Sequence, residues 1–312
     1  MPFLQLATKI CRAFFSRGAR DRSWLSTVPG SEYPRREKTA GEIIRIPGSV
    51  MRPPCLAAMF AAISLPVIAQ ETERRVWKVD DVERHGLVFI PAGAKASPTP
   101  VVFVFHGHGG SSQNALNSFA MNKAWPEAIS VYPQGLNTPG KLTDPQGKKA
   151  GWQVGAGDQG NRDLKLFDTM LGSLKKDYKI DEKRIYSTGH SNGGGFTYLL
   201  WAERGDLFAA MGPSAAVGWR ASDKLRPKPL FHIASKNDQL VKYEWQKSMI
   251  DKVIKLNSTG DPIAMNDDKH CTLHPSKDGH DVVLYLDEGG HKFAGKDAVT
   301  AMVRFFKDHP KK

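Results

Sequence analysis

The stretch that decides the fold is Arg184-Ile-Tyr-Ser-Thr-Gly-His-Ser-Asn-Gly-Gly-Gly-Phe196. Its first five residues are mostly β-branched or aromatic, which predicts a strand. The apolar residues from Phe196 to Trp201 predict a helix directly afterwards. Between strand and helix lies the pattern Gly-x-Ser-x-Gly, with Ser191 at its centre. In this context the pattern predicts a sharp turn that lifts the serine side chain above the carboxyl end of the strand.

Two features of such a turn favour Ser191 as a nucleophile. A side chain at position 189 or 193 would collide with the backbone of so tight a turn, so both positions are expected to need glycine. A helix beginning near Asn192 would direct its positive end toward the serine, where it favours negative charge on a tetrahedral intermediate. The alternative is a glycine-rich helix start that contains a serine by chance.

Strand-like and helix-like segments alternate from Arg75 onward. Apolar residues recur at helical spacing in 164–177, 240–255 and 297–307, and Asp163 is expected to be the N-cap of the first. Continuous apolar runs, typical of strands covered on both faces, lie at 86–90, 100–105, 128–132, 184–188, 209–211, 229–233 and 281–286. The alternation predicts a doubly wound, mostly parallel sheet in a single domain, residues 70–312. Residues 133–159 and 258–279 are expected to be loops.

A serine nucleophile needs a histidine base, and the base needs a carboxylate that orients it. Asp238 follows the strand predicted at 229–233, and His291 follows the strand predicted at 281–286. Both lie just beyond the carboxyl ends of their strands, where open α/β sheets place their sites. We therefore predict a triad of Ser191, Asp238 and His291. The rivals are less well placed along their strands: Asp223, Asp287, His232 and His280.

An oxyanion hole requires two convergent backbone N–H groups. The first is expected at Asn192, directly after the nucleophile. The second should follow the strand at 100–105, where the chain continues His106-Gly-His-Gly-Gly110; His108 is preferred, and Gly109 is the second choice. The His-x-His pattern also occurs in some zinc hydrolases, but Gly110 and the serine after it supply no further ligand. No metal or cofactor is predicted.

The motifs HGHGG, GHSNGG, SKNDQLV and GGHKF resemble those of the secreted esterases that include polyhydroxybutyrate depolymerases, feruloyl esterases and acetylxylan esterases. The similarity covers about residues 85–310. It implies an α/β-hydrolase fold and hydrolysis of carboxylic esters without a cofactor. His108 stands where the depolymerases often carry cysteine, and the paired cysteines of many of them are missing. The resemblance therefore favours the reaction over any one substrate.

The substrate is predicted only as a class. Few residues separate the strands at 209–211 and 229–233, which predicts a minimal lid and a cleft open to a polyester, an esterified polysaccharide or a phenolic ester. Trp152 is a candidate platform for a sugar or phenolic ring, and its alternative role is to anchor the loop by packing. Two other functions remain open. A serine peptidase would typically add a gating domain, and a non-catalytic binding protein would usually lack a triad residue.

The first 69 residues are expected to lie outside the catalytic domain. Residues 51–69 carry Arg52, an apolar run and small residues before Gln70, the pattern of a signal peptide. The run is too short to span a bilayer, which predicts a secreted or periplasmic protein with no stable membrane anchor. Residues 1–50 are then an upstream extension that the natural protein lacks, or else an organelle presequence.

The cysteine content and the charge add little to the functional prediction. Of the three cysteines, only Cys271 lies in the predicted domain, so no internal disulfide is expected there. The formal net charge is +12. No basic run with interleaved aromatic residues accompanies it, so no nucleic-acid partner is predicted. No sequence pattern predicts an oligomeric state.

Overall fold

A computed structural model describes residues 72–265 and 268–312, and these belong to one compact unit. The predictions made for residues 1–50 and for the signal peptide at 51–69 lie outside the described residues, so export remains a prediction. No helix in the described part of the chain is both long enough and apolar enough to cross a membrane.

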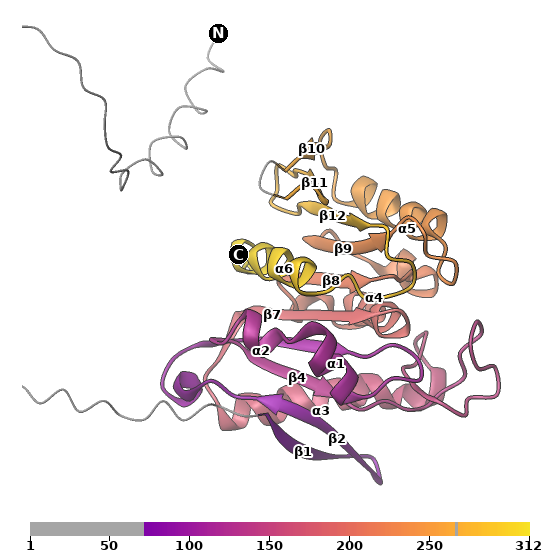
Figure 1. Ribbon diagram of the computed structural model, residues 1–312. Helices are drawn as coiled ribbons and strands as arrows, with labels where there is room; N and C mark the ends of the chain where they lie inside the picture. Colours follow the sequence, from indigo (N-terminus) through magenta and orange to yellow (C-terminus); the bar gives the residue numbers. More distant parts are fainter. Residues whose placement is uncertain (1–71, 266–267) are drawn as a thin grey trace, which may run out of the picture. The chain divides into compact units, whose positions relative to one another are not determined.

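A twisted sheet of ten strands runs through the described residues (Figure 1). Its spatial order is β1-β2-β4-β3-β7-β8-β9-β12-β11-β10. The strands from β4 to β12 in this order are parallel, and both edges are antiparallel. The strands are β1 (Glu73–Val79), β2 (Val82–Phe89), β3 (Thr99–Phe105), β4 (Ile129–Pro133), β7 (Ile180–His190), β8 (Ala210–Ser214), β9 (Leu230–Ser235), β10 (Ile263–Ala264), β11 (Cys271–His274) and β12 (Val282–Asp287).

Helices cover both faces of the sheet, as the doubly wound prediction requires (Figure 1). The helices are α1 (Ser112–Phe119), α2 (Met121–Ala124), α3 (Arg162–Asp177), α4 (Asn192–Arg204), α5 (Tyr243–Leu256) and α6 (Lys296–Asp308), with short 3-10 helices η1 (Ala92–Lys95), η2 (Asp158–Asn161), η3 (Gly205–Leu207) and η4 (Trp219–Lys224). Strand β3 shows the division of the core. Phe103 and Phe105 pack with α3 and α4, whereas Val102 and Val104 pack with α1, α2 and α6.

Two stretches predicted as loops contain short strands. β5 (Leu136–Asn137) and β6 (Ala150–Gly151) pair as a small ribbon within 133–159. β10 and β11 lie within 258–279 and extend the main sheet at one edge. Strand β1, at the other edge, was also not predicted. β1 is mostly exposed and largely charged, and the other four strands have only two to four residues each, so none of them shows the apolar run by which the central strands were identified.

The prediction that Asp163 is the N-cap of α3 was wrong. The cap is supplied from outside the helix by Gln153, whose Oε1 accepts hydrogen bonds from the N–H groups of Asp163 (3.0 Å) and Leu164 (3.2 Å). The carboxylate of Asp163 is instead buried and pairs with the guanidinium of Arg84 at 2.9 Å. Asp163 is the second residue of α3, inside its first turn, and its other oxygen accepts from the N–H of Gln153 at 2.8 Å. The sequence does not reveal these partners.

Candidate active site

Ser191 lies in the turn between β7 and α4 with a backbone conformation that serine rarely adopts. Its φ is 55° and its ψ is −119°, which costs of the order of 1–3 kcal/mol for a residue with a side chain. The neighbouring strand holds the turn, because the N–H of Ser191 donates to the carbonyl of Ser214 at 2.8 Å. Helix α4 begins at the next residue, as predicted, so its N-terminal N–H groups lie beside the serine.

Gly189 and Gly193, on either side of this turn, leave no space for a side chain. A Cβ at Gly189 would come within 2.5 Å of the carbonyl of Gly193. A Cβ at Gly193 would strike the carbonyl oxygen of Phe105. The turn is therefore packed against the end of β3, and these two positions admit no larger residue without movement of the backbone.

The structure brings the three predicted triad residues together at the carboxyl edge of the parallel strands. Asp238 follows β9 and His291 follows β12, and these strands are direct neighbours. Nδ1 of His291 lies 2.8 Å from Oδ2 of Asp238, and Nε2 of the same ring lies 2.9 Å from Oγ of Ser191. In this geometry Nδ1 donates to the carboxylate, which leaves Nε2 free to accept the serine proton.

Backbone and side-chain donors hold Asp238 in place. The residue is 2% exposed, and Oδ1 accepts hydrogen bonds from the N–H groups of Leu240 and Val241, both at 2.9 Å. Oδ2 accepts a third from Nε2 of Gln246 at 3.1 Å, in addition to that from His291. Gln246 was not predicted as part of the site. The available signal was a polar residue in register with Met249, Ile250 and Val253 on the buried face of α5.

The N–H groups of the predicted oxyanion hole differ in what they already bind. The N–H of Gly109 donates to the carbonyl of Ala150 at 2.7 Å, so the second-choice donor is already used. No backbone bond of this kind involves the N–H of His108 among the described residues. Both ring nitrogens of His108 have partners of their own: Nε2 donates to the carbonyl of Thr138 (2.8 Å), and Nδ1 accepts from the hydroxyl of Thr143 (3.0 Å).

The prediction that Trp152 is a substrate platform was wrong, and the packing alternative is correct. Its side chain is fully buried, stacks on Phe196 and donates from Nε1 to the carbonyl of His106 at 2.8 Å. Its backbone N–H and carbonyl bind the side-chain amide of Asn192, at 2.7 and 3.0 Å. Trp152 therefore anchors its loop against the first turn of α4.

The rival titratable residues have other partners. Asp223 is exposed and pairs with Lys252, and Asp287 accepts a hydrogen bond from the nearby N–H of Gly289. His232 is fully buried, and burial lowers its pKa to about 4. His190, next to the nucleophile, also has its pKa lowered to about 4, first by burial and then by the nearby His291. Both rings are therefore neutral at pH 7.

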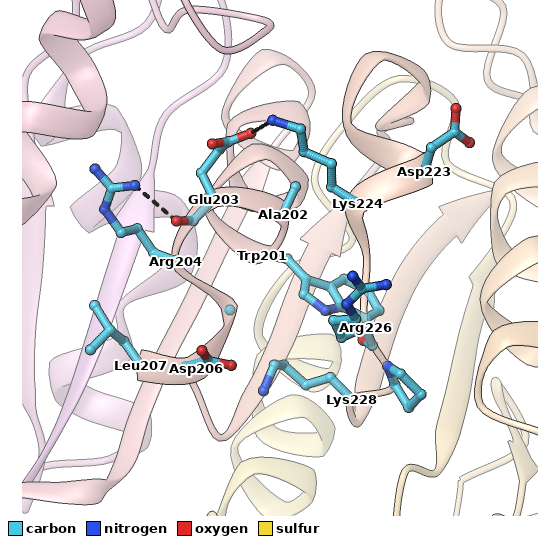
Figure 2. Close-up of a pocket in the computed structure, with 12 residues that line it drawn as sticks. Trp201, Ala202, Glu203, Arg204, Asp206, Leu207, Asp223, Lys224, Arg226 and Lys228 are labelled. Carbon is cyan, nitrogen blue, oxygen red and sulfur yellow. Dashed lines mark hydrogen bonds and ion pairs between the residues drawn. The ribbon is translucent and has the colours of Figure 1, made fainter.

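A hollow of about 700 Å³ lies at the opposite edge of the sheet, before β8 and β9 begin (Figure 2). Several of its charged side chains already have partners. Arg204 binds Asp168, Lys224 binds Glu203, and Lys228 donates to a backbone carbonyl. The length of the strands separates this hollow from Ser191, so we assign it no part in the candidate site. Within the described residues, no group of three or more histidine, cysteine or acidic side chains could hold a metal ion.

Comparison with solved structures confirms the predicted fold. An acetyl xylan esterase from Aspergillus awamori superposes with a TM-score of 0.57 at 13% identity, covering 76% of this chain and 99% of that one. A ferulic acid esterase from Anaeromyces mucronatus gives 0.52 at 16% identity, covering 77% and 90%. The protein therefore has the α/β-hydrolase fold, and at these identities the likeness extends to the fold alone.

Sequence comparison supports the predicted resemblance to the esterase group. A bifunctional acetylxylan esterase/xylanase from Neocallimastix patriciarum is 36% identical over 87 residues, 28% of this chain and 13% of that protein. A probable feruloyl esterase C from Aspergillus clavatus is 29% identical over 111 residues, 36% and 38% of the two chains. The chain thus spans well under two thirds of these relatives. No protein-family model matches it, and the likeness to polyhydroxybutyrate depolymerases remains a prediction.

Proposed function

We propose that this protein is a serine esterase that hydrolyses carboxylic esters through Ser191, His291 and Asp238. The observation that carries the proposal is the unbroken hydrogen-bonded chain from the Oγ of Ser191 through the imidazole to a buried carboxylate, at the carboxyl edge of the sheet. The strained turn and the N-terminus of α4 support it, because they place a nucleophile beside N–H donors. The esterase names of the relatives point to the same reaction.

In the proposed mechanism, Oγ of Ser191 attacks the ester carbonyl while Nε2 of His291 takes the hydroxyl proton. The carbonyl oxygen becomes an oxyanion that accepts hydrogen bonds from the backbone N–H groups of His108 and Asn192. The C–O bond to the alcohol then breaks, and His291 returns the proton to the leaving oxygen. Water repeats the sequence on the acyl-enzyme, which releases the acid and restores Ser191. Asp238 holds the imidazole and stabilises its charged form.

The first test is Ser191→Ala. We expect kcat for a panel of p-nitrophenyl acyl esters, methyl ferulate and acetylated xylan to fall by about 10³–10⁶-fold with the fold unchanged by circular dichroism. Labelling by a fluorophosphonate probe should disappear in the same variant. Retention of more than about a tenth of the activity would show that Ser191 is not the nucleophile. A peptide p-nitroanilide in the panel tests the alternative of a serine peptidase.

For the substrate class we propose esters of polysaccharides or phenolic acids, and for the ring platform we propose Trp219 in place of Trp152. Trp219 is 44% exposed at the start of η4. The chain leading to it crosses the first turn of α4, since the Val217 carbonyl lies 3.6 Å from a Cβ built at Gly195. The N–H of Gly195 donates to the backbone carbonyl of Ser191 at 2.9 Å. We propose that this exposed indole stacks on a ring of the substrate.

The platform is tested with Trp219→Ala and, as a conservative control, Trp219→Phe. We expect KM for methyl ferulate to rise about tenfold in the alanine variant, the equivalent of roughly 1.4 kcal/mol of lost stacking, and less in the phenylalanine variant. KM for ethyl acetate, which has no ring in its acyl or its alcohol part, should change far less. Equal changes for both substrates would contradict a role in ring recognition.

A further inference from the structure

A chain of polar side chains continues from Asp238 into the core. Nε2 of Gln246 donates to Oδ2 of Asp238 at 3.1 Å and to the carbonyl of Val241 at 2.7 Å. Oε1 of Gln246 lies 3.3 Å from Nε2 of His232, and Nδ1 of His232 lies 2.9 Å from the hydroxyl of Tyr198. The side chains of Gln246, His232 and Tyr198 are all fully buried.

The partners fix the direction of every hydrogen bond in this chain. One end of the Gln246 amide faces two acceptors, so that end must be the NH₂ group and the other end the oxygen. His232 therefore carries its proton on Nε2 and donates to Gln246. Its Nδ1 is left unprotonated and accepts from the hydroxyl of Tyr198. Each group thus donates toward the carboxylate of Asp238, and such an alignment strengthens successive bonds.

We propose that these three side chains are positioning residues, which hold the carboxylate of Asp238 in the orientation that the proposed ester hydrolysis needs. The inference rests on the proposed function. The chain links three elements, because Tyr198 belongs to α4, His232 to β9 and Gln246 to α5. Since α4 begins directly after Ser191, the chain also fixes the helix of the nucleophile relative to the loop of the acid.

The bonds at the carboxylate explain why this should affect the rate. Oδ1 of Asp238 accepts from the N–H groups of Leu240 and Val241. Among the described residues, Oδ2 is bound only by Gln246 and by His291 itself. Without Gln246, the oxygen that orients the imidazole loses the one bond independent of that ring. It also keeps more negative charge to share with the imidazolium, so the acidic limb of the pH–rate profile should move to higher pH.

The experiment compares Gln246→Met, which removes the donor at similar length, with Tyr198→Phe, which removes only the far end of the chain. The matched control is Tyr132→Phe, since Tyr132 is also fully buried but its hydroxyl binds Asn122 outside the chain. We expect Gln246→Met to lower kcat about tenfold with KM within about twofold, and to shift the acidic limb upward. Tyr198→Phe should act in the same direction by a smaller factor, and Tyr132→Phe should leave both readouts unchanged.

Two further variants separate positioning from packing. His232→Gln retains an amide donor near the position of Nε2 and should preserve more of kcat than His232→Leu. In the double variant of Gln246→Met and Tyr198→Phe, the second change should add little, because the chain is already broken. Additive losses in this pair would overturn the proposal, as would kcat values and pH profiles for Tyr198→Phe that match those of Tyr132→Phe.

A readout without turnover separates this inference from the esterase proposal. The proton on Nδ1 of His291 should give a low-field proton NMR signal, since it is held between nitrogen and carboxylate at 2.8 Å. We expect the signal to move in Gln246→Met and in Tyr198→Phe and to stay unchanged in Tyr132→Phe. An unchanged chemical shift in Gln246→Met and Tyr198→Phe overturns the positioning role. A signal that moves in a protein without ester turnover supports the positioning role and removes the esterase proposal.

Discussion

At the scale of single residues, three aspartates lie close to the strands that carry the candidate site, and each has a different partner. Asp238 is bound by His291, Asp287 by the N–H of Gly289, and Asp223 by the exposed Lys252. We expect Asp238→Asn to lower kcat by about 10⁴-fold, as in the comparable protease triad, because an amide can hold the wrong imidazole tautomer. Asp287→Asn and Asp223→Asn should each cost about tenfold or less.

The three aspartate variants should be measured in parallel on one p-nitrophenyl ester, with circular dichroism to confirm folding. The ranking matters more than any single value. If Asp287→Asn lowered kcat more than Asp238→Asn did, Asp287 and not Asp238 would orient the base. The hydrogen bond from His291 to Asp238 would then not serve catalysis.

At the scale of an element, the start of α4 offers a matched pair of glycines. A Cβ at Gly193 would strike the carbonyl oxygens of Phe105 and His106, whereas the nearest atom to a Cβ at Gly195 lies at 3.6 Å. We expect Gly193→Ala to displace the turn, with loss of most activity and a clear drop in the free energy of unfolding. Gly195→Ala should fold normally and gain up to about 1 kcal/mol, because alanine is the better helix former.

Urea unfolding and turnover of a p-nitrophenyl ester check the two glycine variants together. If Gly193→Ala were active, the end of β3 would have moved to make room for the methyl group. The tight packing of this turn would then not be needed for the reaction.

At the scale of the whole molecule, two buried histidines should make stability depend on pH. Burial lowers the pKa of His190 and His232 from 6.5 to about 4. The unfolded chain therefore takes up these protons first as the pH falls. Their contribution is complete above about pH 6.5 and is lost on the way down to about pH 4, at about 1.4 kcal/mol per pH unit for each histidine. From pH 7.5 to 5.0 we expect the free energy of unfolding to fall by about 2–4 kcal/mol.

Urea unfolding at several pH values measures this slope. Burial also lowers the pKa of His106, which adds to the slope in the same direction. His232→Gln removes one titrating group and should lower the slope between pH 6.5 and 5, whatever it does to stability at pH 7.5. A free energy of unfolding that stays constant from pH 7.5 to 5.0 would contradict the pKa values of both histidines.

The sequence by itself determined the central sheet, its covering helices and the order of the candidate site along the chain. These features are local: continuous apolar runs mark buried strands, and Gly-x-Ser-x-Gly between strand and helix marks the turn at Ser191. Asp238 and His291 could be predicted because the carboxyl ends of parallel strands meet at one edge of a sheet. The edge strands were not predicted, since β1 is mostly exposed and charged and β10 and β11 have only two and four residues.

Only the tertiary structure decided which partners these side chains meet. Trp152 is a large aromatic residue in a polar loop, and nothing adjacent to it in sequence shows that Phe196 and His106 enclose it. Asp163 precedes the apolar run of α3 as a cap would, but it lies inside the helix and pairs with Arg84, 79 residues earlier. The same holds for the bond from Gln246 to Asp238. Burial and hydrogen bonding between distant segments depend on how the elements pack, and a local pattern carries no record of that packing.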